Sequence, residues 1–454
     1  MAATRKRKGT RVRVSLNQAY DNGYNTGYNA GHSHGFNLGF QKGGDAFAAG
    51  FDGTSIVIPT YNQHKYLADC IDSIGRHTPE PHEIIVVDNG STDGTAAYLR
   101  SLRRSNVRYK ICDRNLGFAG GVNQGLMMAR GATVLFLNND TVVTESWLGN
   151  LLACLNGNER FGLVGPVTNY ISGEQLIETK YASMEEMHRF ARNNNRSDSG
   201  KWSAVDRLTG FCVLMRRDVF QRIGYLDEGF EIGNCEDDDF GFRNRLLGLD
   251  LVIAKDTFIH HVGSTTIRTL TPEQFEEMYN RNLAFYSDKW GETHSLLHEV
   301  AVHWSGRPLA VNDLYPSHVT VKGTGPTAFW VEQGIRRPLE RSEGIPAVRL
   351  SQIELKNWPT GDPISVAEWT AKQSALGAVG SESDPLTEGG IVRTPDGRLH
   401  QHRSGKLHRI ATDWVYRVWG LDRYGVRPVS DSTAVQHPPG LPVIAPPVIK
   451  ADNI

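Results

Sequence analysis

Apolar runs alternate with amphipathic segments between residues 52 and 295, and this alternation constrains the fold more than any other feature of the sequence. The runs SIVIP, HEIIVVD, VRYKICD and ATVLFLNND show little polar alternation, whereas HKYLADCIDSIGRH places its apolar residues on one helical face. Strands of this kind are buried on both faces, and the helices between them supply the cover. The sequence therefore predicts an α/β domain over residues 52–295, built on a mostly parallel sheet.

Polar residues stand at the ends of these predicted strands, where open α/β sheets bind their ligands. The carboxylate of Asp88 can accept hydrogen bonds from a base or a ribose, and the glycines of RNLGFAGGVNQG suit close approach to a phosphate or a sugar. The oxygen atoms after the fourth strand suit a hard divalent cation. The same motifs also fit ordinary turns and loops, so each alone leaves both interpretations open. The strand-end residues are Pro59, Thr60, Tyr61, Asn62, Asp88, Asn89, Arg114, Asn115, Asn138, Asn139 and Asp140.

Four acidic residues follow one another in GNCEDDDFGF, from Glu236 to Asp239. Like charges packed together disfavour ionisation, and the flanking Cys235 and phenylalanines are unusual for a solvated acidic face. The cluster therefore predicts a metal ion, a proton or a basic partner nearby. Arg243 follows Asp239 by four residues at the start of a predicted helix, which allows a structural ion pair on one helical face. Asp238 is expected to be exposed to solvent.

The remaining regions differ from this domain in composition. Residues 1–51 begin with basic residues and carry a glycine every four residues from Gly23 to Gly43, mostly followed by an aromatic residue or histidine. This pattern fits either a loosely ordered tail or a helix used for self-association in a homo-oligomer. Residues 296–318 are interpreted as a linker. Residues 319–454 contain two similar stretches, VTVKGTGPTAFWVEQGIRRPL and GIVRTPDGRLHQHRSGKLHRI, which predict a small β-rich accessory module with two hairpin-like repeats.

Composition argues against several classes of protein. The formal net charge of -1 offers no electrostatic case for a nucleic-acid partner. The sequence lacks the run of about 18 apolar residues that a transmembrane helix needs, and its basic N-terminus lacks the apolar stretch of a secretory signal. The cysteines show no paired spacing and are expected to be reduced thiols, which favours a cytoplasmic protein. The basic N-terminus allows at most a peripheral contact with an anionic membrane.

The stretch from RLTGF to HHVGS closely resembles the inverting family 2 glycosyltransferases, especially their rhamnosyltransferase-like bacterial branch. The matching features are Thr209-Gly210, RRDVF, GYLDEGF, the acidic run with its arginine, and a histidine before VGS. IVIPTYNQ, VVDNGSTDGT, RNLGFAGGVNQG and LFLNND precede them in the order and approximate spacing of that family. The resemblance covers about residues 54–266, and it implies a GT-A (Rossmann-like) fold and a role in bacterial glycan synthesis.

This resemblance implies a nucleotide-diphosphate sugar as donor and a divalent cation, Mn²⁺ or Mg²⁺, as cofactor. Asp140 is implied to bind the metal, although the common family motif has aspartate at one or both positions where this chain has asparagine. One histidine is implied to join it, either His260 or His261, because consecutive strand residues point to opposite faces. The spacing of the HVG motif favours His261. The residues implied to hold the donor are Pro59, Thr60, Tyr61, Asp88, Asn115, Asn123, Asn138 and Asn139.

The resemblance also implies a catalytic pair within the acidic run. Asp237 is implied to be the general base that takes the proton of the acceptor, and Glu236 is implied to contact the acceptor or the sugar. Crowding by the neighbouring carboxylates should raise the pKa of Asp237 towards useful basicity. The acceptor is left open between a saccharide, a lipid-linked intermediate and a protein.

Two other functions compete with this interpretation. A sugar nucleotidyltransferase would need a glycine-rich loop with a basic residue near the first strand, and IPTYNQHKY has no such loop. A non-catalytic scaffold that binds carbohydrate or nucleotide would have no need of the Glu236-Asp237 pair. The sequence therefore favours an enzyme of the glycosyltransferase class.

Overall fold

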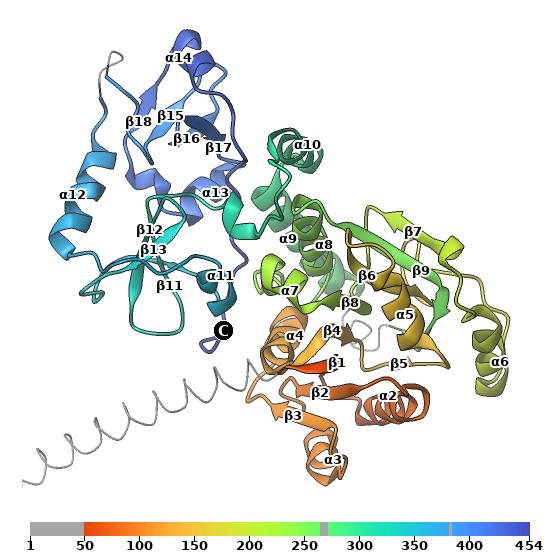
Figure 1. Cartoon of the computed structure of the whole chain (residues 1–454). Coiled ribbons are helices and arrows are strands. Elements are labelled where there is room, and N and C mark those ends of the chain that lie inside the picture. Colours follow the sequence, from red (N-terminus) through yellow and green to blue (C-terminus); the bar gives the residue numbers. More distant parts are fainter. Residues whose placement is uncertain (1–49, 264–270, 381–383) are drawn as a thin grey trace, which may run out of the picture. The chain divides into compact units, whose positions relative to one another are not determined.

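A computed structural model describes residues 50–263, 271–380 and 384–454, so the glycine-repeat segment lies outside the described residues (Figure 1). Asp52–Ile454 belong to one unit. Helices and strands alternate through its first part, as the sequence predicts. In chain order they are β1 Phe51–Thr60, α2 His64–His77, β2 His82–Asp88, α3 Thr95–Ser101, β3 Val107–Ile111, α4 Gly117–Met128, β4 Gly131–Leu137, β5 Thr141–Val142, α5 Trp147–Asn156, β6 Phe161–Val167, α6 Met184–Asn194, η1 Ser199–Lys201, β7 Trp202–Val205, β8 Cys212–Arg216, α7 Arg217–Ile223, α8 Glu236–Leu246, β9 Asp250–Phe258, β10 His260–His261, α9 Pro272–Trp290 and α10 Thr293–His303.

The large sheet has eight strands in the order β3-β2-β1-β4-β8-β6-β9-β7. Strand β1 pairs in parallel with β2, β2 with β3, and β6 with β9. Strand β8 runs antiparallel to β4 and β6, and β7 runs antiparallel to β9. The predicted α/β class is confirmed, but the sheet is mixed rather than mostly parallel. The sequence of β8 does not indicate whether the strand runs parallel or antiparallel to its neighbours, because a strand buried on both faces has the same apolar pattern in either direction.

Helices cover both faces of the sheet, which produces two hydrophobic cores (Figure 1). Val57 of β1 packs into one core with Val122 of α4. Its neighbours Ile56 and Ile58 pack into the other core with Ile71 of α2. This division follows from strand geometry, because successive side chains of a strand point to opposite faces.

The strand register brings the polar strand ends together. Thr60 at the end of β1 is paired with Asp88 at the end of β2, so the segments that follow them lie side by side. The short strand β5 comes directly after β4 and pairs with β10, which sets His261 opposite Thr141. Segments separated by more than a hundred residues therefore meet at one edge of the sheet.

The glycines of α4 serve packing as well as the site. A Cβ atom at Gly125 would lie 2.2 Å from Cγ1 of Val57, so only glycine lets the helix approach β1 this closely. Gly117 begins the helix with a φ of 75° and lines the cavity described below. The glycine-rich motif therefore has a packing reason in addition to the ligand approach predicted from the sequence.

The C-terminal part contains two four-stranded sheets, in the orders β13-β12-β11-β14 and β17-β16-β15-β18. In each sheet three consecutive strands are antiparallel, and the fourth pairs in parallel with the first. The predicted β-rich C-terminal module is thus confirmed. Its elements are η3 Val311–Leu314, β11 Val319–Lys322, β12 Ala328–Glu332, β13 Ile335–Pro338, β14 Val348–Arg349, α11 Gln352–Lys356, α12 Val366–Gly377, β15 Ile391–Arg393, β16 Leu399–Arg403, β17 Lys406–Arg409, α13 Asp413–Val418, η4 Leu421–Arg423, β18 Val426–Pro428 and α14 Asp431–Gln436.

The two C-terminal sheets repeat each other in detail. Their second and third strands are joined by Gln333-Gly334 in one and Ser404-Gly405 in the other, and all four residues have positive φ, as in type I′ turns. A later segment in each repeat, WPTGDPI (residues 358–364) and HPPGLPV (residues 437–443), then pairs with the third strand of its own sheet in the same register. The bridges are Arg336–Thr360 and Leu339–Ile364 in the first sheet, and Leu407–Pro439 and Ile410–Val443 in the second. The repeat therefore extends beyond the hairpins to the segments that close each sheet.

Within residues 50–263, 271–380 and 384–454, no helix combines the length and the apolar character that crossing a bilayer requires.

Candidate functional site

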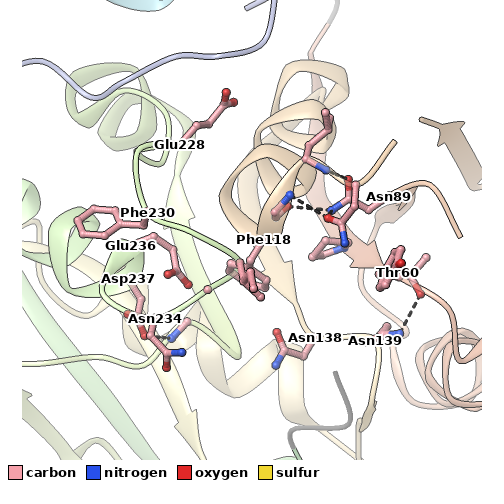
Figure 2. Close-up of a pocket in the computed structure, with 18 of the residues that line it drawn as sticks. Thr60, Asn89, Phe118, Asn138, Asn139, Glu228, Phe230, Asn234, Glu236 and Asp237 are labelled. Atoms are coloured by element: carbon pink, nitrogen blue, oxygen red, sulfur yellow. Dashed lines mark hydrogen bonds between the residues drawn. The ribbon is translucent and has the colours of Figure 1, made fainter. Parts of the chain in front are cut away.

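A cavity of about 1850 Å³ lies where the strand ends meet. Figure 2 shows Glu236 and Asp237 on one side of it and Asn139 and Thr60 on the other, with Phe118 between them. The predicted site residues that line the cavity are Pro59, Thr60, Tyr61, Asn115, Asn138, Asn139, Asp140, Glu236, Asp237 and His261. Those outside its lining are Asp88, Asn123, Asp239, Arg243 and His260. The tertiary structure therefore gathers ten of the fifteen predicted residues around one cavity.

Asn89 fixes the segment from Asn115 to Gly117 at the cavity; the sequence marks Asn89 as a strand-end residue but assigns it no role. Its amide group donates to the side chain of Asn115 at 3.0 Å and to the carbonyl of Gly117 at 2.8 Å, and its Oδ1 accepts from the backbone N–H of Leu116 (Figure 2). The adjacent Asp88 is fully buried: Oδ1 accepts from the N–H of Ser91, whereas Oδ2 has no hydrogen-bond partner among the described residues. The position after Asp88, rather than Asp88 itself, thus faces the cavity.

Asn123 lies inside the protein rather than at the cavity. Its amide donates to the carbonyl of Leu226 and to Oε1 of Glu228, each at 2.9 Å, and its Oδ1 accepts from the N–H of Leu226. Glu228 in turn accepts the backbone N–H groups of Lys450 and Ala451. Asn123 therefore connects α4 to the GYLDEGF loop, and through Glu228 to the C-terminal segment.

Asp140 and His261 are buried and face each other, with 3.1 Å between Oδ1 and Nε2. The Nδ1 atom of His261 lies 2.8 Å from the carbonyl oxygen of Tyr170, which can only accept a hydrogen bond, so the ring proton belongs on Nδ1. In neutral histidine the lone pair of Nε2 then points at the carboxylate of Asp140. Two electron-pair donors would face each other, and a cation bound by both would remove that repulsion. His260 points elsewhere, and its Nδ1 lies 2.7 Å from the hydroxyl of Tyr181.

Glu236 and Asp237, here called the acid pair, are the first two residues of α8. Oδ2 of Asp237 accepts from the N–H of Gly210 at 2.9 Å, and Oδ1 accepts from the N–H of Asp238 at 3.0 Å. Burial raises the pKa of Asp237, the charge of Asp238 raises it further, and Arg207 partly opposes both. Burial and the neighbouring Asp237 charge raise the pKa of Glu236 well above its ordinary value. Oε2 of Glu236 is buried and has no hydrogen-bond partner among the described residues.

The loop before this pair is strained and is held from outside. Ile232, Asn234 and Cys235 have φ values of 59°, 79° and 71°, a left-handed conformation that residues other than glycine rarely adopt. Asn282 of α9 clamps the loop: its Oδ1 accepts from the N–H of Glu231, and its amide donates to three loop carbonyls. Strain of this kind persists only where surrounding structure enforces it, and it clusters at functional sites.

The other members of the acidic run have basic partners. Asp238 accepts from Nε of Arg207 at 2.6 Å, so it is paired rather than simply solvated. Arg243 donates to Oδ2 of the fully buried Asp239 through two nitrogen atoms. Lys289 of α9 donates to the other oxygen of Asp239 and to Asp227. Burial alone would raise the pKa of Asp239, but Lys289 and Arg243 together lower it.

Comparison with known proteins identifies the part of the chain that carries most of this site. Residues 55–224 match the family model described as "Glycosyl transferase family 2". The chain is 27% identical over 183 residues to glycosyltransferase GlyG of Streptococcus pneumoniae serotype 4, covering 38% of this chain and 59% of that protein. It is 29% identical over 237 residues to O-antigen biosynthesis protein RfbC of Myxococcus xanthus, covering 49% of this chain and 18% of that protein. The match thus spans less than two thirds of either relative.

Solved structures show lower identity. The mannosyltransferase PcManGT from Pyrobaculum calidifontis, in complex with GDP-Man and Mn²⁺, is 18% identical and has a TM-score of 0.39; the alignment covers 61% of this chain and 80% of that one. The large mixed sheet agrees with the GT-A-like fold predicted for this region. The ordered strand-end motifs and the family match lead to one conclusion: residues 55–224 of this chain form a glycosyltransferase family 2 domain.

Proposed function

We propose that this protein transfers a sugar from a nucleotide-diphosphate sugar to an acceptor hydroxyl, with inversion at the anomeric carbon and Asp237 as general base. One observation carries the proposal: Asp237 lines the strand-end cavity with a raised pKa, and two backbone N–H groups fix its carboxylate. The family 2 match supports the class of reaction. A non-catalytic scaffold would gain nothing from burying an acid pair, because burial of carboxylates opposes their ionisation.

The donor would lie against the strand ends. Pro59 near the end of β1, Tyr61 just after it and Asn115 after β3 line the cavity and would contact the nucleotide. Asn138 lines it beside Asp140 and would face the diphosphate or the sugar. Asn139 donates to the hydroxyl of Thr60 at 2.8 Å, which fixes the two segments relative to each other.

Asp140, which follows β4, and His261 of β10 fit a divalent cation. Asp140 and His261 offer one carboxylate oxygen and one imidazole nitrogen at the same point, and the Tyr170 carbonyl fixes the ring as a second-shell partner does. Among the described residues no group of three metal-binding side chains occurs, so the remaining ligands would be diphosphate oxygens and water. When bound, such a cation neutralises charge that develops on the leaving diphosphate.

In the transfer step the acceptor hydroxyl attacks the anomeric carbon from the face opposite the diphosphate. The new bond joins the acceptor oxygen to that carbon, and the bond to the diphosphate breaks with its electron pair. Asp237 takes the hydroxyl proton. Glu236, whose Oε2 is buried without a partner among the described residues, would accept a second hydrogen bond from the acceptor.

A donor screen tests the proposal. UDP-, GDP- and TDP-sugars are each mixed with the protein, with and without Mn²⁺, and thermal stability and nucleotide release are measured. One donor class is expected to raise the melting temperature and to release its nucleoside diphosphate when an acceptor is present. If every nucleotide sugar leaves the melting temperature unchanged, the protein binds no such donor and the proposal is wrong.

Loss of the imidazole of His261 is expected to weaken Mn²⁺ binding in the presence of the nucleoside diphosphate by about tenfold or more. The measurement is the dissociation constant of Mn²⁺ from electron paramagnetic resonance, for His261→Gln and for the adjacent control His260→Gln. The control should bind Mn²⁺ as the wild type does, because His260 faces Tyr181. If the two substitutions weaken Mn²⁺ binding equally, or if His261→Gln does not weaken it, the metal does not bind at His261.

The pH profile should report the environment of Asp237. Its ionised form is needed as base, and its pKa is raised above the ordinary 3.8, so the acid limb of kcat/KM is expected above pH 3.8. Asp238→Asn removes a repulsive charge and leaves Arg207 without its partner, and both changes favour ionised Asp237. The limb of that variant is therefore expected at lower pH. A limb that moves to higher pH would contradict this assignment. Because Glu236 titrates in the same pair, the measured values belong to the pair.

A further inference from the structure

Helix α9 presents an aromatic face to the side of the cavity that carries Glu236 and Asp237, here called the acid side. Phe275, Tyr279 and Asn282 follow at intervals of four and three residues, which puts them on one helical face. Phe275 lines the cavity, and its ring lies parallel to that of Tyr279, with centroids 6.1 Å apart and 8° between the planes. The side chain of Tyr279 is 39% exposed. Two large parallel rings therefore stand together, one lining the cavity and the other exposed next to it.

The contacts of α9 fix this surface relative to the catalytic loop. Asn282, on the same face, is 2% exposed and bonds the backbone of the loop from Glu231 to Asn234. Arg281 adds two bonds to the carboxylate of Glu231. The aromatic face is thus held next to the segment that leads directly to Glu236.

Two further apolar side chains are exposed within the same cavity. Ile232 is 45% exposed although it has a left-handed backbone, so its position is not explained by core packing. Tyr170, from the segment after β6, is 39% exposed, and its ring meets that of His261 edge to face at 5.9 Å. Exposed apolar surface that lines a groove is characteristic of a ligand-binding site.

The charges of the described residues on this side do not favour an anionic ligand. The lining cations Lys110, Arg114 and Lys450 come from β3, the loop after it and the C-terminal segment, not from the segments around the acid pair. Arg207 does come from those segments, but its Nε donates to Asp238 at 2.6 Å and its Nη1 to the hydroxyl of Ser172 at 3.3 Å. In this part of the described chain, Glu236 and Asp237 therefore stand with exposed apolar side chains and a paired arginine.

We infer that the acceptor is a neutral saccharide, whose pyranose ring stacks on Phe275 and Tyr279 while its hydroxyls reach Glu236 and Asp237. This inference rests on the proposed function and selects one of the three acceptor classes. A pyranose has an apolar C–H face that matches an aromatic ring and hydroxyls that donate to carboxylates. A phosphorylated acceptor would bring its charge to Glu236 and Asp237, where Arg207, the described arginine that lines the cavity on this side, is already paired with Asp238. A peptide could donate N–H groups to the same carboxylates, but its backbone lacks the flat C–H face that an aromatic ring matches.

Binding of neutral methyl pyranosides tests the inference directly. Methyl glycosides of glucose, galactose, mannose, rhamnose and N-acetylglucosamine, and the 6-phosphates of the first three, are each added to the protein with nucleoside diphosphate and Mn²⁺. Saturation-transfer NMR then measures contact between protein and sugar. At least one neutral glycoside is expected to bind, with the strongest transfer to the ring protons of one face. Exclusive binding of phosphorylated sugars, or binding of none, would overturn the inference.

A matched set of variants locates the contact. Tyr279→Ala and Phe275→Ala are each expected to raise the dissociation constant of the glycoside by about tenfold. Phe275→Tyr is expected to bind the glycoside as the wild type does, because it keeps the ring. The control is Tyr109→Ala on β3, where the tyrosine is 40% exposed but does not line the cavity. Equal losses in control and test variants, or no loss in Tyr279→Ala and Phe275→Ala, would overturn the placement.

Donor affinity separates this inference from the function on which it rests. The dissociation constant of the nucleotide sugar, measured by calorimetry, is expected to be the same in wild type, Tyr279→Ala and Phe275→Ala. A protein that binds the donor but transfers only to a phosphorylated or peptide acceptor would refute the saccharide inference alone. A protein that binds no nucleotide sugar would refute the proposed function, and the inference with it.

Discussion

Replacement of Asp237 by asparagine is expected to lower the rate of sugar transfer by about 10²- to 10⁴-fold, with little change in donor affinity. Asparagine has nearly the same shape and can still accept the N–H of Gly210, but it cannot take the proton of the acceptor hydroxyl. Single-turnover rates and donor binding by calorimetry give the two quantities separately. Transfer at the wild-type rate in Asp237→Asn would remove this residue from the mechanism.

Asp238→Asn is the matched control for that experiment. Asp238 is the next residue on the same turn of α8, and the substitution removes the same charge, but its carboxylate pairs with Arg207. The variant is expected to retain most of its transfer activity at neutral pH, because Asp237 remains available as base. A loss as large as that of Asp237→Asn would mean that the charge of the whole run, rather than one base, supports the reaction.

Replacement of Lys289 by methionine is expected to destabilise the protein by about 3 to 5 kcal/mol. The ammonium group of Lys289 is fully buried and lies 2.6 Å from Asp227 and 2.5 Å from Asp239. Methionine would leave Asp227 without its cation in the interior, and Asp239 with Arg243 and the indole N–H of Trp290. The measurement is the free energy of unfolding from urea titrations monitored by tryptophan fluorescence.

Lys180→Met provides the comparison for stability. Lys180 is also paired, at 3.5 Å from Glu178, but its side chain is 86% exposed. Water already solvates both charges there, so the loss is expected to be about 0 to 1 kcal/mol. Similar unfolding free energies for the two variants would show that the buried network around Lys289 contributes no more than a surface pair. Because the pair of Lys289 with Asp239 joins α9 to α8, a large effect would show that these two helices unfold together.

Local patterns in the sequence are enough to predict the class of fold and most of the cavity. Apolar runs separated by amphipathic segments indicate buried strands with helical cover, and polar residues after the strands indicate where ligands bind. Asn138, Asp140 and Tyr61 all line one cavity for this reason. The spacing of Asp239 and Arg243 likewise indicates an ion pair within one helix, and Arg243 does donate to Asp239.

Side-chain direction and strand direction need the tertiary structure. The dipeptide His260-His261 is symmetrical in sequence, and only the pairing of β10 with β5 turns His261 towards Asp140. Asn123 follows the family motif, yet the docking of the GYLDEGF loop on α4 buries it away from the cavity. The antiparallel direction of β8 has no signature in an apolar run.

The sequence alone determines the α/β character, the strand ends that meet at the cavity, and the acidic run that begins α8, because periodicity and spacing encode burial and local contacts. Only the tertiary structure decides which partners the acids have. Arg207 and Lys289 approach the run from 31 and 50 residues away, and Asn282 clamps the loop before it from 48 to 51 residues away. These contacts depend on how α9 and the loops pack against α8, and no local pattern records that packing.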